Sequence, residues 1–401
     1  MKKPYTRIYA DAAASTPIHP RVGKRMIALL DTFGNPGGLH AEALAAAREL
    51  EGARKEIAES IGAHADEIIF TASGTESNDL AIFGMLRPLL REHKNMHAIT
   101  LPIEHPSVLE PLEYLKKHEG LSLTHVEVDE DGLVSPKEIY EAIAPDTALV
   151  SIQLVNSEIG TIEPVREIAK MIRRARKERA AAGNTLPIVF HVDAAQAPLY
   201  LDLKVEALGV DLVTLDAQKV QGPKSVGVLY RRRGVDLEPV ILGGTQERGL
   251  RAGTGNCVLA GAFAEALTIA QKGVEVRAKK VAVVRDYLLA EIQKVIPGTE
   301  VNGTMTSRAP NNLNISIPGL DGEIAVIALD AAGIAISTRS ACSTEDENPS
   351  HVLAALGHSQ SRARTAIRIT LLPDATKQDA KCIAQALKDA YTLYQKPHDL
   401  G

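Results

Sequence analysis

The sequence predicts an α/β protein whose main domain is a doubly wound, largely parallel sheet, accompanied by a smaller α+β domain. The chain of 401 residues is too long for one ordinary core, which favours more than one domain. From about residue 68 to residue 230, short β-branched runs alternate with helical patterns. This alternation is typical of parallel strands with helices on both faces of the sheet. Beyond about residue 256, long Ala-rich helical stretches take over and predict a separate, smaller domain.

The first expected helix lies between residues 44 and 61. Apolar residues recur there at helical spacing, and Gly62 follows as a stop signal. A series of β-branched and apolar runs then predicts the strands of the main sheet. These runs are residues 68–70, 98–100, 149–152, 188–192, 212–215 and 226–230.

The smaller domain is expected to contain strands at residues 312–317 and 366–369, and a final amphipathic helix from about Lys377 to Tyr394. The turn-rich stretch "LGGTQERGLRAGTGN", from Leu242 to Asn256, marks the expected boundary. We therefore predict a large domain of residues 15–255. The small domain comprises residues 1–14 and 256–401, and it carries the segment around Cys342.

Charge and hydropathy exclude several classes of protein. A formal net charge of −5, with both signs interspersed, argues against a dedicated nucleic-acid or membrane-binding surface. No apolar run approaches the roughly 20 residues that span a bilayer. The N-terminal stretch "MKKPYTRIYADAAAS" has no apolar core of a signal peptide. A cytoplasmic location is the expectation.

The cysteines are few and odd in number. Three of them fit a reducing compartment better than a disulfide framework. Cys257 and Cys382 lie in Ala/Leu-rich helical patterns, so we expect both thiols to be buried and inert. Cys342 differs because it lies in the polar segment "STRSACSTEDENPS", which has no apolar period. Taken alone, this segment leaves an incidental surface thiol and a reactive one equally open.

Small and hydroxyl residues follow the run at residues 68–70. The stretch "TASGTESN", from Thr71 to Asn78, leads into an apolar helical pattern. Free backbone N–H groups at such a helix N-terminus can hold a phosphate. Ser73 or Thr75 with a nearby acid is equally typical of a capping box. By itself, this stretch favours the capping interpretation.

Chemically active side chains follow other runs of the same sheet, where a doubly wound sheet binds its ligands. Asp193 and Lys219 follow neighbouring runs, His105 follows the run at 98–100, and Asn156 follows the run at 149–152. Singly, each is more simply a cap or a solvated side chain. Together with a phosphate cradle, however, a lysine that can form a Schiff base and an acid that keeps a pyridine nitrogen protonated are what pyridoxal 5′-phosphate (PLP) needs.

Arg368 is a charged residue inside the apolar run at residues 366–369. A buried guanidinium requires a partner, and a substrate carboxylate is a candidate for bidentate pairing. No metal site is expected.

Short motifs occur in a fixed order along nearly the whole chain. They are Gly-Thr-Glu-Ser at 74–77, Glu-His at 104–105, Val-Asn-Ser-Glu-Ile-Gly at 155–160, His-Val-Asp-Ala-Ala-Gln at 191–196, Lys219 with Gly-Pro-Lys at 222–224, Gly-Gly at 243–244, Glu-Arg-Gly at 247–249, Arg-Ala-Gly-Thr at 251–254, Ser-Ala-Cys at 340–342, and Arg368. Each motif is weak, but the ordered set resembles the cysteine desulfurases of the NifS/IscS type, in the class V aminotransferase group. The resemblance implies the fold-type I architecture of PLP enzymes, with a large domain whose mostly parallel sheet is wrapped by helices.

The resemblance implies a role for each residue around the cofactor ring. Lys219 would attach PLP covalently, and Asp193 would pair with the pyridinium nitrogen. Gln196 would bond the phenolic oxygen of the ring. His105 would stack on the ring and transfer protons.

The resemblance also implies how the phosphate and the substrate are held. Gly74 and Thr75 would bind the phosphate, helped by Thr254 from the other subunit of a homodimer. Asn156 would contact the cofactor and the substrate, and Arg368 would bind the substrate carboxylate.

The chain departs from the family at three positions. Asp216-Ala217-Gln218-Lys219 stands where the family commonly has Ser-Gly-His-Lys or Ser-Ala-His-Lys, so Asp216 and Gln218 are the expected neighbours of the phosphate. A carboxylate and a phosphate a few ångströms apart repel each other. Asp216 is therefore expected to turn away, to be protonated, or to be neutralised by a base such as Arg251. Arg339 replaces the glycine that usually precedes Ser-Ala-Cys.

The activity implied by the resemblance is the conversion of L-cysteine to L-alanine, with sulfur transferred to Cys342 as a persulfide. A sulfur-acceptor protein, either an iron-sulfur scaffold or a thiolation factor, would be the partner. Alternatives are a selenocysteine lyase, another class V aminotransferase-like enzyme, or a catalytically weak scaffold paralogue. The Cys342 segment argues against an aminotransferase, which has no use for a nucleophilic thiol, and the intact Lys219 argues against the scaffold.

Overall fold

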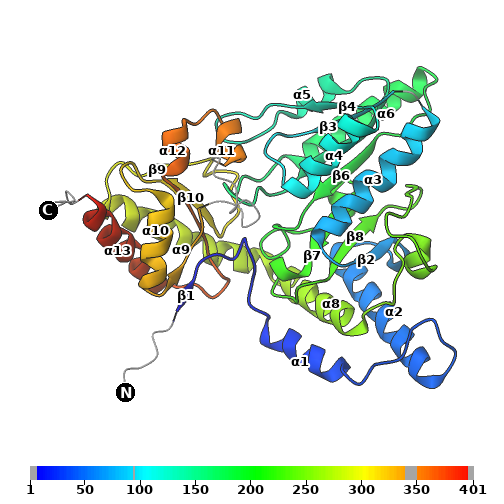
Figure 1. The fold of residues 1–401 in the computed structure, drawn as a ribbon, viewed down its shortest axis with the longest axis horizontal. Coiled ribbons are helices and arrows are strands. Elements are labelled where there is room, and N and C mark those ends of the chain that lie inside the picture. Colours follow the sequence, from blue (N-terminus) through cyan, green and yellow to red (C-terminus); the bar gives the residue numbers. More distant parts are fainter. Residues whose placement is uncertain (1–6, 94, 339–349, 396–401) are drawn as a thin grey trace.

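The computed structural model describes residues 7–93, 95–338 and 350–395. Their helices and strands form two parts that lie side by side (Figure 1). One part is built around a seven-stranded sheet, and the other around a three-stranded sheet. The division at residues 255 and 256 stays a prediction. Helix α8 (Cys257–Gln271), which follows that division, packs against helices α1 (Pro20–Leu29) and α2 (Ala41–Ile61) of the first part.

The seven-stranded sheet has the strand order β2-β8-β7-β6-β5-β3-β4. The strands are β2 (Ile68–Thr71), β3 (Met96–Thr100), β4 (Leu121–His125), β5 (Thr147–Gln153), β6 (Val189–Asp193), β7 (Leu212–Asp216) and β8 (Gly227–Arg231). Strands β4, β3, β5, β6 and β7 pair in parallel, whereas β8 is antiparallel to both of its neighbours. The predicted mostly parallel sheet is confirmed, and every run expected as a strand of it lies on one.

Helices cover both faces of this sheet, because alternate residues of each strand point to opposite faces. One face packs against α3 (Gly74–Glu92) and α4 (Pro106–His118), and it includes Ile69, Ala98, Leu149, Val189, Leu212 and Leu229. The other packs against α2, α8 and α6 (Val165–Ala181), and it includes Phe70, Ile99, Val150, Phe190, Val213 and Val228. Polar side chains inside the sheet, such as Ser151, His191 and Thr214, hydrogen-bond to one another, so the strand ends are where polar groups can meet a ligand.

The second part is an α+β unit, as expected. Strands β12 (Ala366–Thr370), β10 (Asn312–Ser316) and β9 (Glu300–Val301) form an antiparallel sheet in that order, and β1 (Ile8–Tyr9) pairs in parallel with β11 (Ile334–Ala335). Helices α9 (Val274–Val295), α10 (Gly322–Ala331) and α13 (Lys377–Tyr394) pack around the antiparallel sheet (Figure 1). The remaining helices are α5 (Pro136–Ala142), α7 (Val205–Leu208), α11 (His351–Ala355), α12 (Gln360–Arg364) and the short 3-10 turns η1 (Ala65–Glu67), η2 (Ala217–Lys219) and η3 (Gln246–Gly249).

One of the two thiols expected to be buried is exposed. Cys257 is buried at the start of α8, and its Sγ donates to the carbonyl of Ala46. Cys382 is exposed, so the prediction of a buried thiol is wrong there. Helix α13 buries the face that carries Ile383 and Leu387, and Cys382 lies outside that face. Among the described residues, no single helix has the length and apolar character to cross a membrane, and only the α8–α9 pair, bent by 71°, passes that test jointly.

A carboxyl group is buried where the chain leaves the loop after β5. Glu163 is 2% exposed, and its Oε2 accepts a hydrogen bond from the backbone N–H of Val134. Its Oε1 has no hydrogen-bond partner among the described residues. Burial raises the pKa of Glu163 to about 8, against the lowering effect of the Val134 N–H. At pH values between the unfolded pKa and about 8, the carboxyl group is therefore neutral in the folded chain and ionised in the unfolded chain.

This carboxyl group makes stability fall as pH rises. Because the folded pKa lies above the unfolded one, the contribution of Glu163 is complete below the unfolded pKa and is lost as pH rises through about 8. Between pH 6 and pH 8, we expect the wild type to lose about 2 kcal/mol of unfolding free energy relative to Glu163→Gln. Urea unfolding at both pH values measures this difference. Glu167→Gln, at an exposed carboxyl group on α6, should follow the wild type. Parallel pH profiles for the wild type and Glu163→Gln would contradict the assignment.

Candidate active site

The carboxyl ends of β5, β6 and β7 open onto a cavity of about 300 Å³. The N-terminal segment at residues 13 and 14 and the start of α3 form other walls of it. Most of the predicted site residues line this cavity. They are Gly74, Thr75, His105, Asp193, Gln196, Asp216, Gln218, Lys219 and Arg368.

Lys219 is the last residue of η2, the turn that begins where β7 ends. Its Nζ donates hydrogen bonds to the backbone carbonyls of Ala13 (2.8 Å) and Ala14 (2.7 Å). The side-chain amide of Gln196 donates to the same Ala13 carbonyl at 2.9 Å. The N-terminal segment therefore holds the lysine amine and the glutamine amide at one wall of the cavity.

A hydrogen-bonded chain joins Asp193 to His105. The side-chain amide nitrogen of Asn78, on α3, donates to Asp193 Oδ2 at 2.9 Å and to Ser107 Oγ at 2.8 Å. Ser107 Oγ lies 2.8 Å from His105 Nδ1. The backbone N–H of Ala195 donates to the other carboxylate oxygen of Asp193. Residues of β6, α3 and α4 are thereby fixed against one another.

The environment of His105 favours its neutral imidazole. The backbone N–H of Ser107 donates to Nδ1 at 3.1 Å, so the proton of the neutral ring lies on Nε2. Burial lowers the pKa of His105, the positive charge of Lys219 acts in the same direction, and the Asp193 carboxylate opposes both. A neutral ring near physiological pH can stack on a flat ligand and exchange protons with it.

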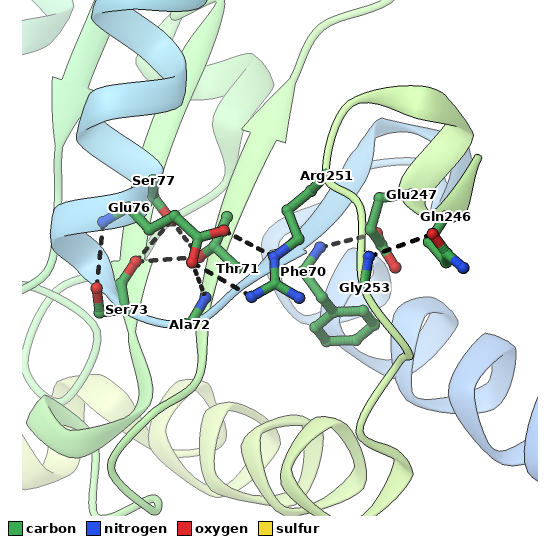
Figure 2. Close-up of polar contacts among 10 residues, drawn as sticks. All are labelled: Phe70, Thr71, Ala72, Ser73, Glu76, Ser77, Gln246, Glu247, Arg251 and Gly253. Carbon is green, nitrogen blue, oxygen red and sulfur yellow. Dashed lines mark hydrogen bonds and ion pairs between the residues drawn. The ribbon is translucent and has the colours of Figure 1, made fainter. Parts of the chain in front are cut away.

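The N-terminus of α3 is capped locally and still faces the cavity. Ser73 is the N-cap residue, and its hydroxyl accepts the backbone N–H of Glu76 at 3.1 Å. The Glu76 carboxylate in turn accepts the backbone N–H of Ala72 at 2.8 Å (Figure 2). Because these caps use other groups, Gly74 and Thr75 remain on the cavity wall. The capping and phosphate-binding interpretations of this stretch are therefore compatible.

Asp216 faces the same helix N-terminus. Its carboxylate accepts hydrogen bonds from the backbone N–H of Gly74 at 3.3 Å, from the backbone N–H of Gln218 at 3.1 Å and from the side-chain amide of Gln218 at 3.0 Å. The residue is 6% exposed and lines the cavity. The expectation that Asp216 turns away is wrong, because the end of β7 directs its side chain at α3.

Arg251 does not neutralise Asp216. Its guanidinium pairs with Glu76, with Nε 2.8 Å from Oε1 and Nη2 3.4 Å from Oε2 (Figure 2). The same loop is held at Glu247, which accepts the backbone N–H of Phe70 and forms a buried ion pair with Arg54. The expectation of an Arg251–Asp216 pair is therefore wrong, because the glutamate in the first turn of α3 takes the guanidinium.

Arg368 is 1% exposed on β12, at the opposite wall of the cavity. Its Nη2 forms an ion pair with Asp11 Oδ1 at 2.8 Å, and its Nη1 donates to the carbonyl of Ser157 at 3.1 Å. Its Nε has no hydrogen-bond partner among the described residues. A buried guanidinium with an unused donor on a cavity wall can bind a carboxylate.

Some of the predicted residues do not reach this cavity. The Asn156 side chain holds its own loop, since Oδ1 accepts the backbone N–H groups of Glu158 and Ile159 and Nδ2 donates to Ile103. Thr254 is exposed and away from the cavity wall. The binding roles of both stay predictions. Cys342 and Arg339 lie outside the described residues.

Sequence reasoning missed the residues that hold the site residues in place. Asn78 ends the stretch from Thr71 to Asn78, and Ser107 lies two residues after His105, but neither carried an assigned role. Asn78 lies one helical turn after Gly74, and this i, i+4 spacing is the signal that could have placed it on the same face of α3. Asp11 carried no such signal, because its partner Arg368 is remote in sequence.

The residues on the cavity fit PLP. An amine, a carboxylate and an imidazole surround one space, as the cofactor ring requires. Asn78 Oδ1 and Arg368 Nε are buried and have no hydrogen-bond partner among the described residues. One acceptor and one donor are therefore available to a bound molecule. A Cβ added to Gly74 would lie 3.3 Å from Asp216, so glycine keeps room at the start of α3.

Known proteins resemble the chain over most of its length. The model of the aminotransferase class-V family matches residues 8–383. Cysteine desulfurase IscS of Dictyoglomus turgidum is 39% identical over 373 residues, which cover 93% of this chain and 91% of the relative. Cysteine desulfurase IscS 1 of Archaeoglobus fulgidus is 37% identical over 380 residues, covering 94% and 95%.

Solved structures agree with these relatives. A NifS-like protein matches with a TM-score of 0.88 at 32% identity, covering 97% of this chain and 100% of the other. SspA in complex with cysteine matches with a TM-score of 0.78 at 33% identity, covering 92% and 100%. Fold and site thus define a PLP-dependent enzyme of fold type I. The chain belongs to the aminotransferase class-V family and, within it, to the cysteine desulfurases of the NifS/IscS type.

The hydrogen-bonded chain through Asn78 should support cofactor binding. Asn78→Ala removes the donor to Asp193 and to Ser107, so we expect the Kd for PLP to rise about tenfold, or about 1.4 kcal/mol. Ser107→Ala keeps the backbone N–H that fixes His105 and should change the Kd about threefold or less. Absorbance titration of the cofactor-free protein measures both values. Unchanged affinity in a folded Asn78→Ala protein would show that the chain of hydrogen bonds does not support the cofactor.

Proposed function

We propose that this chain is a PLP-dependent L-cysteine desulfurase that converts L-cysteine to L-alanine and transfers the sulfur to Cys342 as a persulfide. The single observation that carries the proposal is the convergence of Lys219, Asp193 and His105 on one cavity that Arg368 also lines. The solved relative in complex with cysteine supports the choice of substrate.

The described residues on either side of the segment that contains Cys342 are bonded to Arg368, which lines the cavity, and to Glu104, the neighbour of His105. Ser337 exchanges backbone hydrogen bonds with Arg368, and these anchor the chain just before the segment. After it, Ser350 Oγ donates to Glu158 Oε2 at 2.5 Å, and His351 Nε2 lies 3.0 Å from the carbonyl of Glu104. The chain on both sides of the segment is therefore held next to residues of this site.

The residues of the cavity have distinct tasks in this reaction. When bound, PLP supplies an electron-withdrawing ring that weakens bonds at the attached substrate. Lys219 would attach the cofactor, and the Asp193 carboxylate, held by Asn78, would favour protonation of the ring nitrogen. His105 would exchange a proton through Nε2, since its Nδ1 is occupied by Ser107.

Arg368 and Cys342 would act on the substrate itself. Arg368 would bind the substrate carboxylate and so direct the sulfur towards the thiol. The Cys342 thiolate would form an S–S bond to the substrate sulfur as the C–S bond breaks, and a proton delivered to carbon would complete alanine. A reductant or an acceptor protein then removes the sulfur from Cys342.

The working form that we propose is a cytoplasmic homodimer that delivers sulfur to an iron-sulfur scaffold or a thiolation factor. Several large apolar side chains are exposed around α1 and in the loop before Thr254, and covering them by a second copy would stabilise the pair. They include Phe33 (80% exposed), Leu39 (91%) and Leu242 (80%). Exposed Thr254 would then reach the phosphate of the partner subunit.

Product analysis tests the activity. With L-cysteine and a reductant, the purified protein should release alanine and sulfide in equal amounts. Turnover of L-selenocysteine but not of L-cysteine would favour the selenocysteine lyase alternative. Cys342→Ala should bind PLP normally but lose at least about 100-fold in sulfide release, since neither buried Cys257 nor Cys382 on α13 lines the cavity. The matched control is Cys382→Ala, which removes an exposed thiol on α13 and should keep full activity. Full sulfide release by Cys342→Ala would refute the persulfide step.

Arg368→Lys tests carboxylate binding. Lysine keeps the charge that pairs with Asp11 but loses the planar set of donors, so we expect the KM for L-cysteine to rise about 10- to 100-fold. The kcat should change less than the KM, because the reacting atoms are not contacted. Steady-state kinetics together with a thermal melt separate this effect from misfolding. An unchanged KM in the folded variant would remove Arg368 from the substrate site.

A further inference from the structure

In the arrangement that the structure shows, two of the three ways in which the chain could accommodate a carboxylate beside a cofactor phosphate are not realised. Asp216 does not turn away, because its side chain lines the cavity and accepts the Gly74 N–H. Arg251 does not neutralise it, because its guanidinium pairs with Glu76 (Figure 2). No ion pair of 4.0 Å or less joins Asp216 to a base among the described residues. Protonation is the way that remains.

The Asp216 carboxylate takes hydrogen-bond donors that an anion at this helix N-terminus would use. Gly74 donates its backbone N–H at 3.3 Å, and the Gln218 side-chain amide donates at 3.0 Å. Helix α3 runs from Gly74 to Glu92, so its dipole favours a negative charge at this position. The Asp216 carboxylate therefore occupies the predicted phosphate position.

The charged groups around Asp216 are already engaged. Lys219, on the same turn, donates to the Ala13 and Ala14 carbonyls. Glu76 pairs with Arg251, and Arg368 pairs with Asp11. Asp193 accepts a hydrogen bond from Asn78. The other titratable groups that face the cavity or flank this helix end are His105 and, on α8, Cys257. On the neighbouring strand β8, the residue paired with Asp216 is Gly227, which carries no charge. Nothing in this set supplies a cation at the Asp216 carboxylate.

We propose that Asp216 couples the loading of PLP to the uptake of one proton. Without cofactor, the ionised carboxylate caps the start of α3. With cofactor, the carboxyl group takes a proton from solvent, so that a phosphate oxygen meets an O–H donor in place of a second anion. This inference rests on the proposed PLP site. Through this proton, Asp216 would make the preference for PLP over its unphosphorylated form depend on pH.

The experiment compares two ligands and two proteins. Cofactor-free wild type and Asp216→Asn are titrated with PLP and with pyridoxal, which lacks the phosphate, between pH 6 and pH 8.5. Both ligands react with Lys219, so the ratio of the pyridoxal Kd to the PLP Kd cancels the titration of the lysine. The second ionisation of the phosphate, at about pH 6, affects this ratio equally in both proteins, so the difference between the proteins reports on Asp216. In the wild type, PLP binding would require a proton on Asp216 that the free chain does not hold. The ratio should therefore fall by up to about tenfold for each unit of rising pH. The ratio in Asp216→Asn, whose amide carries no charge, should exceed that of the wild type and fall less with pH.

Calorimetry supplies a readout that does not depend on activity. PLP binding to the wild type at pH 8, measured in two buffers of different protonation enthalpy, should show about one more proton taken up than in Asp216→Asn. Inorganic phosphate should raise the Tm of cofactor-free Asp216→Asn more than that of the wild type. Asp202→Asn removes an exposed carboxylate and should behave as the wild type in each measurement.

The outcomes separate this inference from the proposed function. Equal ratios and equal proton uptake in the wild type and Asp216→Asn would overturn the proton coupling. A wild type that binds no PLP would overturn both the coupling and the proposed function. The ratio could lose its pH dependence in Asp216→Asn while the wild type releases no sulfide from L-cysteine. That result would sustain the coupling and overturn only the desulfurase activity.

Discussion

The parallel pairing of β5, β6 and β7 is the constraint on which the rest of the site depends. Parallel strands bring their carboxyl ends to one edge, and the register places Gln153 opposite Asp193 and Asp193 opposite Thr214. Because helices cover both faces of the sheet, its interior has no room for a polar ligand. The strand ends are the position where an acid, an amide and the lysine of η2 can meet without burying unpaired charge.

A second constraint is the short N-terminal segment that passes between the two parts of the molecule. Thr16 Oγ1 donates to the carbonyl of Gln218, and the Ala13 carbonyl accepts from Lys219. From the same segment, the Ala13 N–H donates to Thr370, and Asp11 pairs with Arg368. The segment thus ties the lysine of the large sheet to the arginine of the small one. The position of Lys219 relative to Arg368 therefore depends on this backbone segment as well as on the two sheets.

The sequence was informative where the determining interactions are local. Strand runs, the α3 start and the residues after each strand could be predicted, because hydrophobic period and turn chemistry act over a few residues. The partnership of Arg251 with Glu76 could not be predicted, because it joins residues 175 positions apart through a loop whose path no local signal defines. The exposure of Cys382 was missed for a related reason. An Ala/Leu-rich helix does not reveal which of its faces meets the core.

The carboxylate at the start of α3 also satisfies a backbone donor of that helix. A helix N-terminus has backbone N–H groups without intrahelical partners, and a buried donor left unsatisfied costs about 1–3 kcal/mol. Asp216 satisfies the Gly74 N–H, and its charge at the helix dipole is worth about 0.3–1 kcal/mol more. A serine hydroxyl at this position would lack that charge. The proposed proton on Asp216 would neutralise this charge when a phosphate binds. Stability of the empty site and affinity for the cofactor are opposed at this one side chain.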